Sequence, residues 1–219
     1  MANYQYCPAS YVVASTFDIS AIDNDSMFLG REEHKKMRLL SFKKRDEFID
    51  QSRHYGDSNE YRDFVSLIAR SQCTFEGHSE DSDETIIFYS EKGKISMVPD
   101  YLFKYSETEF IVEEKFTTTE FDKISDLYLN HKIQALAYLY GMPNPNISSV
   151  FIVYWFYNLK NREVYNSRIF RILKTEANKN QLLNIFESVE KLNRGEVVQL
   201  KTSDINVNKC CLLYTSRCV

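Results

Sequence analysis

Three charged residues, Glu113-Glu114-Lys115, interrupt the apolar, β-rich segment EFIVEEKF at 109–116. Side chains alternate along a strand, so Glu113 and Lys115 share one face and Glu114 points to the other. Asp100 lies on the preceding β-rich segment, and a hairpin would bring it close to Glu113. Two carboxylates this close repel each other unless a cation lies between them, and Mg²⁺ prefers such ligands. The residues therefore predict a metal site for phosphodiester hydrolysis, in which Lys115 orients a water or stabilises developing charge.

The alternative is that the triplet is a solvated strand end. Acid-x-Lys triplets are common, and Glu33-His34-Lys35 is another one in this chain, on a segment expected to be helical. For a triplet taken alone, the solvated end is the commoner explanation. Its context favours the metal site, because a Pro-Asp pair precedes it at 99–100 and because ions have no structural use in so apolar a strand.

The elements that must position these residues follow from hydrophobic patterns and turn signals. Helices are expected at 27–50, 60–70, 124–142 and 178–194, an exposed loop at 77–84, a turn at 106–109, and strands at 85–90, 94–105, 109–117, 148–157 and 162–173. The segment 85–117 is expected to form a three-stranded meander. The 124–142 helix is apolar nearly all round and should end at Gly141 and Pro143. This order predicts an α/β fold with a central mixed β-sheet flanked by helices on both faces.

Composition limits the class of protein. The chain has 219 residues, 43% of them hydrophobic and 26% charged, which is typical of one globular domain. No apolar run is long enough to span a bilayer, and MANYQYCPASYVVAS lacks the basic start of a signal peptide. Five cysteines, an odd number, favour a reducing compartment over a disulfide framework. We therefore expect a cytoplasmic protein with no membrane partner.

The net charge of −4 means that a nucleic-acid partner would have to meet a local basic patch. A basic run follows His34 and supplies candidate phosphate contacts: Lys35, Lys36, Arg38, Lys43, Lys44 and Arg45. Charge runs are more often solvated helix faces, and that alternative stays open.

The motifs together resemble the PD-(D/E)xK nuclease superfamily. Pro99-Asp100 matches the first half of its motif and Glu113-Glu114-Lys115 the second. Two further elements, 30-GREEH-34 upstream and 134-QALAY-138 on the helix after the lysine, are similar to those of the RecB-like branch. That branch includes AddB nuclease domains and CRISPR-associated RecB-like exonucleases. The resemblance spans about residues 1–195 and implies a restriction-endonuclease-like core.

For the motif residues, the resemblance implies specific roles. Asp100, Glu113 and Lys115 would be catalytic, and His34 would join the two carboxylates in binding Mg²⁺ or Mn²⁺. Glu114 would contribute its backbone carbonyl as a further metal ligand.

Gln134 and Tyr138 lie four residues apart on one helix face. The resemblance implies that they position the DNA backbone or order the lysine. Packing in the core explains Tyr138 about equally well.

The resemblance implies a metal-dependent DNA nuclease, and specifically an exonuclease that would act on ends or single strands in repair, recombination or CRISPR-type processing. Its partners would be DNA and a helicase or CRISPR-type complex. One alternative is a catalytically weak DNA-binding or assembly module that keeps the nuclease fold. Another is a restriction endonuclease or junction resolvase, against which His34 and the 134–138 element weigh.

Cysteines at the two ends suggest a further cofactor. Cys7, in 6-YCPASY-11, lies where iron–sulfur members of the RecB-like branch place their first cluster cysteine. Cys210 would be the first of a C-terminal set, which implies a [4Fe-4S] cluster in the full-length protein; Cys7 as a small buried residue is the alternative. The segment CLLYTS at 211–216 matches the translation of a sequencing-library adapter. We therefore expect a single nuclease domain at 1–210 and a non-native read-through tail at 211–219.

Overall fold

The computed structural model describes residues 58–77, 88–90, 95–158, 160–161 and 163–196. The helix expected at 27–50 lies outside these residues, as does the expected loop beyond Gly77. The tail expected at 211–219 also lies outside them.

Five strands form the main sheet in the order β1-β4-β5-β6-β7. They span Gln72–Glu76, Tyr101–Tyr105, Thr108–Thr117, Ile147–Asn158 and Glu163–Leu173. β5 and β6 are parallel, whereas the other neighbouring strands are antiparallel, so the sheet is mixed. The strands β2 (Phe88–Ser90) and β3 (Ile95–Met97) form a separate two-stranded sheet.

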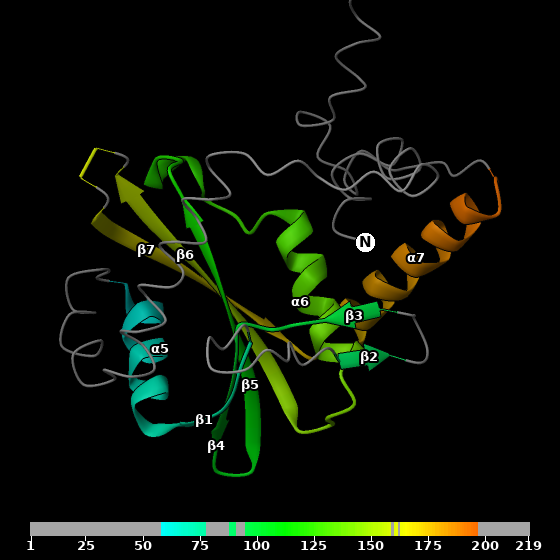
Figure 1. The fold of residues 1–219 in the computed structure, drawn as a ribbon, viewed down its shortest axis with the longest axis horizontal. Helices are drawn as coiled ribbons and strands as arrows, with labels where there is room; N and C mark the ends of the chain where they lie inside the picture. Colours follow the sequence, from blue (N-terminus) through cyan, green and yellow to red (C-terminus); the bar gives the residue numbers. More distant parts are fainter. Residues whose placement is uncertain (1–57, 78–87, 91–94, 159, 162, 197–219) are drawn as a thin grey trace, which may run out of the picture.

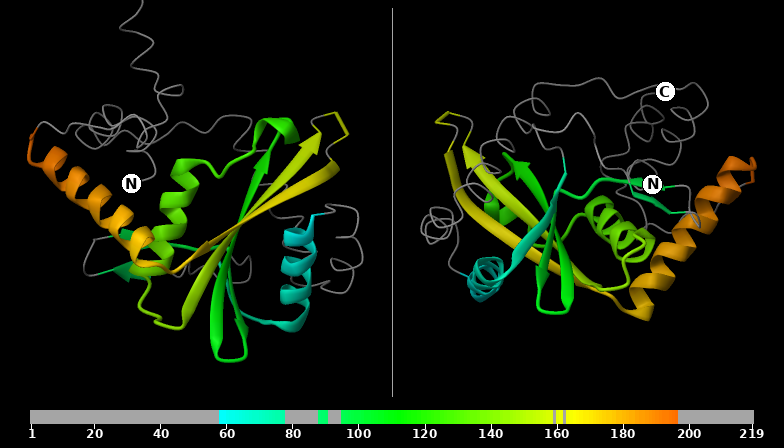
Figure 2. Two further views of the ribbon diagram at one scale, coloured as in Figure 1. Left: turned by 180° about the vertical axis from the view of Figure 1, so that it is seen from behind. Right: turned by 60° about the horizontal axis from the view of Figure 1, so that its bottom comes forward.

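Helices cover both faces of the main sheet (Figure 1). α5 (Asn59–Arg70) packs on one face, and α6 (Leu129–Gly141) and α7 (Glu176–Asn193) lie on the other, as Figure 2 shows from two more directions. The predicted α/β class with a mixed sheet between helices is confirmed.

The alternation of side chains on β5 divides the hydrophobic core into two parts. Phe110 and Val112 pack with α5, whereas Ile111 packs with α6 and α7 on the opposite face. β6 is buried from Ile147 to Tyr157 with one half-buried residue, because both of its faces are covered and both of its edges are paired. Among the described residues, no helix combines the length and apolar character needed to cross a bilayer.

The predicted three-stranded meander at 85–117 is wrong. The expected strand 94–105 is interrupted at 98–100, where Pro99 cannot donate to a ladder, so β3 pairs with β2 and only β4 joins the main sheet. The place beside β4 is taken by β1, which the sequence patterns did not reveal. The turn expected at 106–109 is present, with Ser106 at a φ of 54°.

The helix expected at 124–142 begins later, at Leu129. A 3-10 turn, η2 (Phe121–Lys123), precedes it, and Ile124 is buried rather than helical. The guanidinium of Arg168 on β7 donates to the carbonyl of Ile124 and lies 4.0 Å from the ring centroid of Phe121. These contacts hold the segment before Leu129 in a non-helical path. The helix ends at Gly141, as predicted.

Candidate active site

The two carboxylates of the predicted motif lie next to each other at the end of the β4–β5 hairpin. Tyr101 and Val112 are the last paired residues of this ladder, so Asp100 and Glu113 come directly beyond it. The backbone N–H of Asp100 donates to Glu113 Oε2 at 3.3 Å, and Asp100 Oδ2 accepts from the backbone N–H of Glu114 at 2.8 Å. Both acidic residues are buried, with exposed fractions of 6% and 4%. The hairpin therefore brings two carboxyl groups into one water-poor region.

Lys115 lies on the same face of β5 as Glu113, as the alternation predicts. Its Nζ is 2.6 Å from Glu113 Oε1. Burial raises the pKa of Glu113, and the charge of Asp100 raises it further, so that the opposing effect of Lys115 is outweighed. Burial alone would lower the pKa of Lys115, but the charges of Glu113 and Asp100 outweigh it and the net shift is upward. Lys115 is therefore held as an ammonium group.

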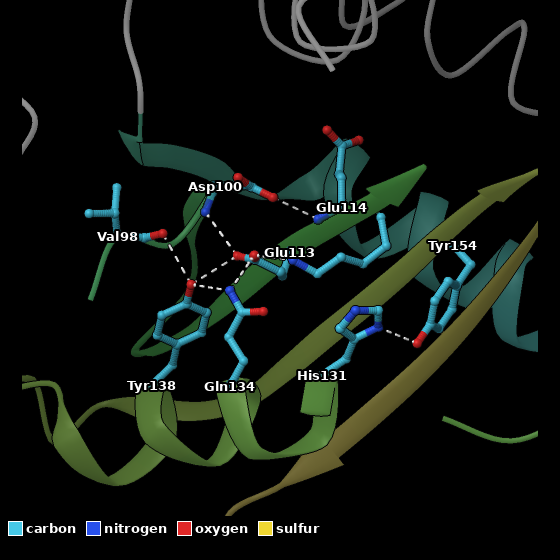
Figure 3. Close-up of polar contacts among 9 residues, drawn as sticks. Val98, Asp100, Glu113, Glu114, His131, Gln134, Tyr138 and Tyr154 are labelled. Atoms are coloured by element: carbon cyan, nitrogen blue, oxygen red, sulfur yellow. Dashed lines mark hydrogen bonds and ion pairs between the residues drawn. The ribbon is translucent and has the colours of Figure 1, made fainter. Parts of the chain in front are cut away.

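α6 presents Gln134 and Tyr138 to the same carboxylate (Figure 3). Gln134 Nε2 donates to Glu113 Oε1 at 2.6 Å and to the hydroxyl of Tyr138 at 2.8 Å. The Tyr138 hydroxyl lies 3.2 Å from Glu113 Oε2 and 3.0 Å from the carbonyl oxygen of Val98. Burial, followed by the charge of Glu113, raises the pKa of Tyr138 far above its ordinary value, so the hydroxyl stays neutral. Both oxygens of Glu113 are thus fixed by donors from β5, from α6 and from the loop before β4.

The contacts of Gln134 and Tyr138 refine the sequence expectation. Both side chains face the cluster, but the described hydrogen bonds join them to Glu113 rather than to Lys115. Tyr138 is at once a core residue, with 3% exposure, and a hydrogen-bonding partner of the cluster. The two explanations offered for Tyr138 are therefore compatible.

Glu114 points away from this cluster. Its carboxylate accepts hydrogen bonds from the indole of Trp155 at 2.9 Å and from the hydroxyl of Tyr101 at 3.2 Å, on the face that α5 covers. A metal ligand from this residue would have to be its backbone carbonyl, as the resemblance implies. The backbone N–H of Glu114 points to Asp100. Because the N–H and C=O of one strand residue point to the same edge, the Glu114 carbonyl also points to the side of the strand on which Asp100 lies.

Gly77 is a residue of this region that the sequence did not reveal. The prediction placed it in an exposed loop, but it is buried, and its N–H donates to the carbonyl of Asp100 at 2.8 Å. A Cβ at this position would lie far inside van der Waals contact of the Pro99 carbonyl oxygen. Glycine is needed because the backbone at Gly77, just after β1, lies too close to the Pro99 carbonyl to leave room for a side chain. The only signal for Gly77 in the sequence was that the chain has just six glycines, so that each one is a candidate for a position where a side chain does not fit.

The cluster has the donor chemistry of a site for a hard divalent cation. Asp100 and Glu113 supply carboxylate oxygens. Burial raises the pKa of Glu113, and the negative charge of Asp100, which a bound cation would offset, raises it further. Within the described residues, no group of three or more His, Cys, Asp or Glu side chains gathers as a metal site. The candidate ligand His34 lies outside these residues, as do Cys7, Cys210 and the basic run at 35–45.

No family model matches this chain, and no curated protein matches it. Among solved structures, the alkaline exonuclease LHK-Exo from Laribacter hongkongensis, in complex with dAMP, is 15% identical, with a TM-score of 0.45 over 88% of this chain and 83% of that one. The structure of SSO0001 is 13% identical, with a TM-score of 0.40 over 87% of this chain and 69% of that one. These similarities are distant, and the function of this chain has to be argued from its own site.

Proposed function

We propose that this protein is a metal-dependent nuclease that hydrolyses phosphodiester bonds of DNA. The observation that carries the proposal is the convergence of Asp100, Glu113 and Lys115 in one buried cluster, with Gln134 and Tyr138 fixing the central carboxylate. Two buried carboxylates beside an ammonium group suit the hydrolysis of a negatively charged ester better than they suit structural packing, because burying charge is costly.

In this proposal, Asp100, Glu113 and the backbone carbonyl of Glu114 hold Mg²⁺ or Mn²⁺, with His34 as a further ligand. The cation, when bound, supplies Lewis acidity toward the phosphodiester and lowers the pKa of a water.

The protein's own groups do the rest. Lys115 has a raised pKa, so it acts as a donor to a phosphate or water oxygen and stabilises developing negative charge, and it does not act as a general base. Gln134 and Tyr138 keep the carboxylate of Glu113 in one orientation between turnovers.

The finer assignment to the RecB-like branch, with DNA ends or single strands as substrate, rests on 30-GREEH-34 and 134-QALAY-138. The hydrogen bonds from Gln134 and Tyr138 to Glu113 support the second element. A helicase or CRISPR-type partner and an iron–sulfur cluster on Cys7 and Cys210 stay predictions.

The test is cleavage of end-labelled single- and double-stranded DNA with Mg²⁺ or Mn²⁺, with and without a chelator. Asp100→Ala and Lys115→Ala should each abolish cleavage while circular dichroism shows a folded protein. Lys104→Ala is the matched control, because Lys104 is an exposed lysine on β4. Cleavage by either site variant at the parent rate would refute the assignment. DNA binding without cleavage under any divalent metal would favour the DNA-binding module.

A further inference from the structure

A third buried carboxylate, that of Glu114, takes no part in the chemistry proposed above. Glu114 is 6% exposed and lies on the α5 face of the sheet, among aromatic and aliphatic core residues. Both donors described for its carboxylate, the indole of Trp155 and the hydroxyl of Tyr101, are neutral groups. Burying a carboxylate is costly, and apolar residues of similar size often replace buried charges without loss of stability. Packing alone therefore does not explain a glutamate at this position.

Glu114 is bound to two consecutive residues of the neighbouring segment. Its backbone N–H donates to Asp100 Oδ2 at 2.8 Å, and its Oε2 accepts from the hydroxyl of Tyr101 at 3.2 Å. Figure 3 shows the first of these bonds, and it shows the carboxylate of Glu114 turned away from Glu113. One hydrogen bond leaves a side chain free to pivot about it, whereas a second attachment one residue away limits that rotation. The two bonds together hold the Asp100 carboxylate in one orientation.

A third contact fixes Glu114 itself. The indole of Trp155 on β6 donates to Glu114 Oε1 at 2.9 Å. The two carboxylate oxygens thus bind neighbours on opposite sides of β5, because Oε1 accepts from β6 and Oε2 accepts from β4. Trp155 and Tyr101 are 1% and 2% exposed, so the packing around their rings leaves both donors little freedom to move. The Glu114 side chain is therefore a rigid link between three strands, beside the pair Asp100 and Glu113.

We propose that Glu114 is a positioning residue that acts through Asp100. Its carboxylate, held by Trp155, anchors Tyr101 and so sets the direction in which Asp100 presents its oxygens to a cation. Ligand oxygens have to be held to within about 0.5 Å, and partners behind the ligands usually provide this precision. The inference rests on the proposed function, because it takes Asp100 as a metal ligand. The competing explanation is that Glu114 only joins the strands and contributes to stability.

Mn²⁺ affinity and stability, measured on the same variants, separate the two explanations. Calorimetry gives the Mn²⁺ affinity, and thermal unfolding gives Tm, for Tyr101→Phe, Glu114→Leu and Glu114→Gln. Tyr101→Phe removes one hydroxyl and keeps the ring, so it tests the inference even if Glu114→Leu fails to fold. Two further variants are controls. Tyr140→Phe loses a hydroxyl that bonds to Thr175, and Phe110→Leu loses packing in the core on the α5 face without removing a polar group.

Tyr101→Phe should weaken Mn²⁺ binding about three- to tenfold, the size of one hydrogen bond. Glu114→Leu should weaken it at least about tenfold, and adding Tyr101→Phe to that variant should weaken it no further. Glu114→Gln should bind like the parent, because its amide offers an oxygen to Trp155 and an N–H to the hydroxyl oxygen of Tyr101. Tyr140→Phe and Phe110→Leu should lower Tm and keep the Mn²⁺ affinity of the parent.

Parent-like Mn²⁺ binding by either Tyr101→Phe or a folded Glu114→Leu would overturn the inference. Equal weakening by a control with the same loss of Tm would also overturn it, because the role would then be structural. Weakening by Glu114→Gln as large as that by Glu114→Leu would overturn it as well, since charge and not orientation would be responsible.

DNA cleavage by the same samples separates this inference from the proposed function. If the parent cuts DNA with Mn²⁺ and the expected pattern of Mn²⁺ affinities is missing, the inference fails and the proposed function stands. If the pattern is present and no divalent metal supports cleavage, the proposed function fails and the positioning role of Glu114 stands.

Discussion

Replacing Tyr138 by Phe tests whether the hydroxyl orients Glu113. The hydroxyl accepts from Gln134 and has one proton to share between the carbonyl of Val98, at 3.0 Å, and Glu113 Oε2, at 3.2 Å. Removal of the hydroxyl leaves one of these buried acceptors without its donor, which lowers the free energy of unfolding by about 2 kcal/mol. For a domain of this size, that loss lowers Tm by roughly 4–8 °C. Guanidinium unfolding should show a lower midpoint at an unchanged slope.

The same change should lower metal-dependent cleavage about 10–100-fold, as is usual when a partner of a metal-binding carboxylate is lost. Tyr140→Phe is the control two residues along α6. Its hydroxyl exchanges hydrogen bonds with the backbone of Thr175 at 2.6 and 2.7 Å, outside the cluster. Tyr140→Phe should lower the free energy of unfolding by at most about 1 kcal/mol and leave cleavage unchanged. If Tyr138→Phe matches Tyr140→Phe in both stability and cleavage, the orienting role is refuted.

Three further outcomes are expected. Gly77→Ala should displace the Pro99-Asp100 peptide, lower the free energy of unfolding by about 1–3 kcal/mol and abolish cleavage. Gly195, at a φ of +76° with open space around it, is the control, and Gly195→Ala should be less stable than the parent and still cut DNA. Equal cleavage by both variants would contradict the role of Gly77. Lys115→Ala should bind Mn²⁺ at least as tightly as the parent, because a competing cation is gone, and yet should not cut; calorimetry that shows weaker binding would count against this. Burial and the charge of Asp100 raise the pKa of Glu113 above 4.5, so the stability that protonated Glu113 provides is present below pH 4.5 and is lost as the pH rises through the raised value. Mn²⁺ should therefore raise Tm more at pH 8 than at pH 5, and equal increments would contradict the prediction.

Local patterns predicted the parts of the site that depend on alternation within one strand. The period of two on β5 correctly separated Glu113 and Lys115 from Glu114, and the hairpin correctly brought Asp100 near Glu113. Helical spacing likewise put Gln134 and Tyr138 on one face.

Contacts between distant segments were beyond the reach of these patterns. β1 is a short edge strand, QCTFE, with weak alternation, so its pairing with β4 and the burial of Gly77 depend on tertiary packing. The division of 85–117 between two sheets arises at Pro99, whose effect on strand pairing depends on which neighbour is available. The contact between His131 and Tyr154 joins residues 23 apart and has no sequence signature.

Direct titration of the metal-free protein with Mn²⁺ by calorimetry tests most directly whether Asp100 and Glu113 form one cation site. The parent should bind Mn²⁺, and Asp100→Asn and Glu113→Gln should each weaken binding at least about tenfold. Glu114→Gln should bind like the parent, because that carboxylate faces Trp155. Parent-like Mn²⁺ binding by both Asp100→Asn and Glu113→Gln would contradict the account.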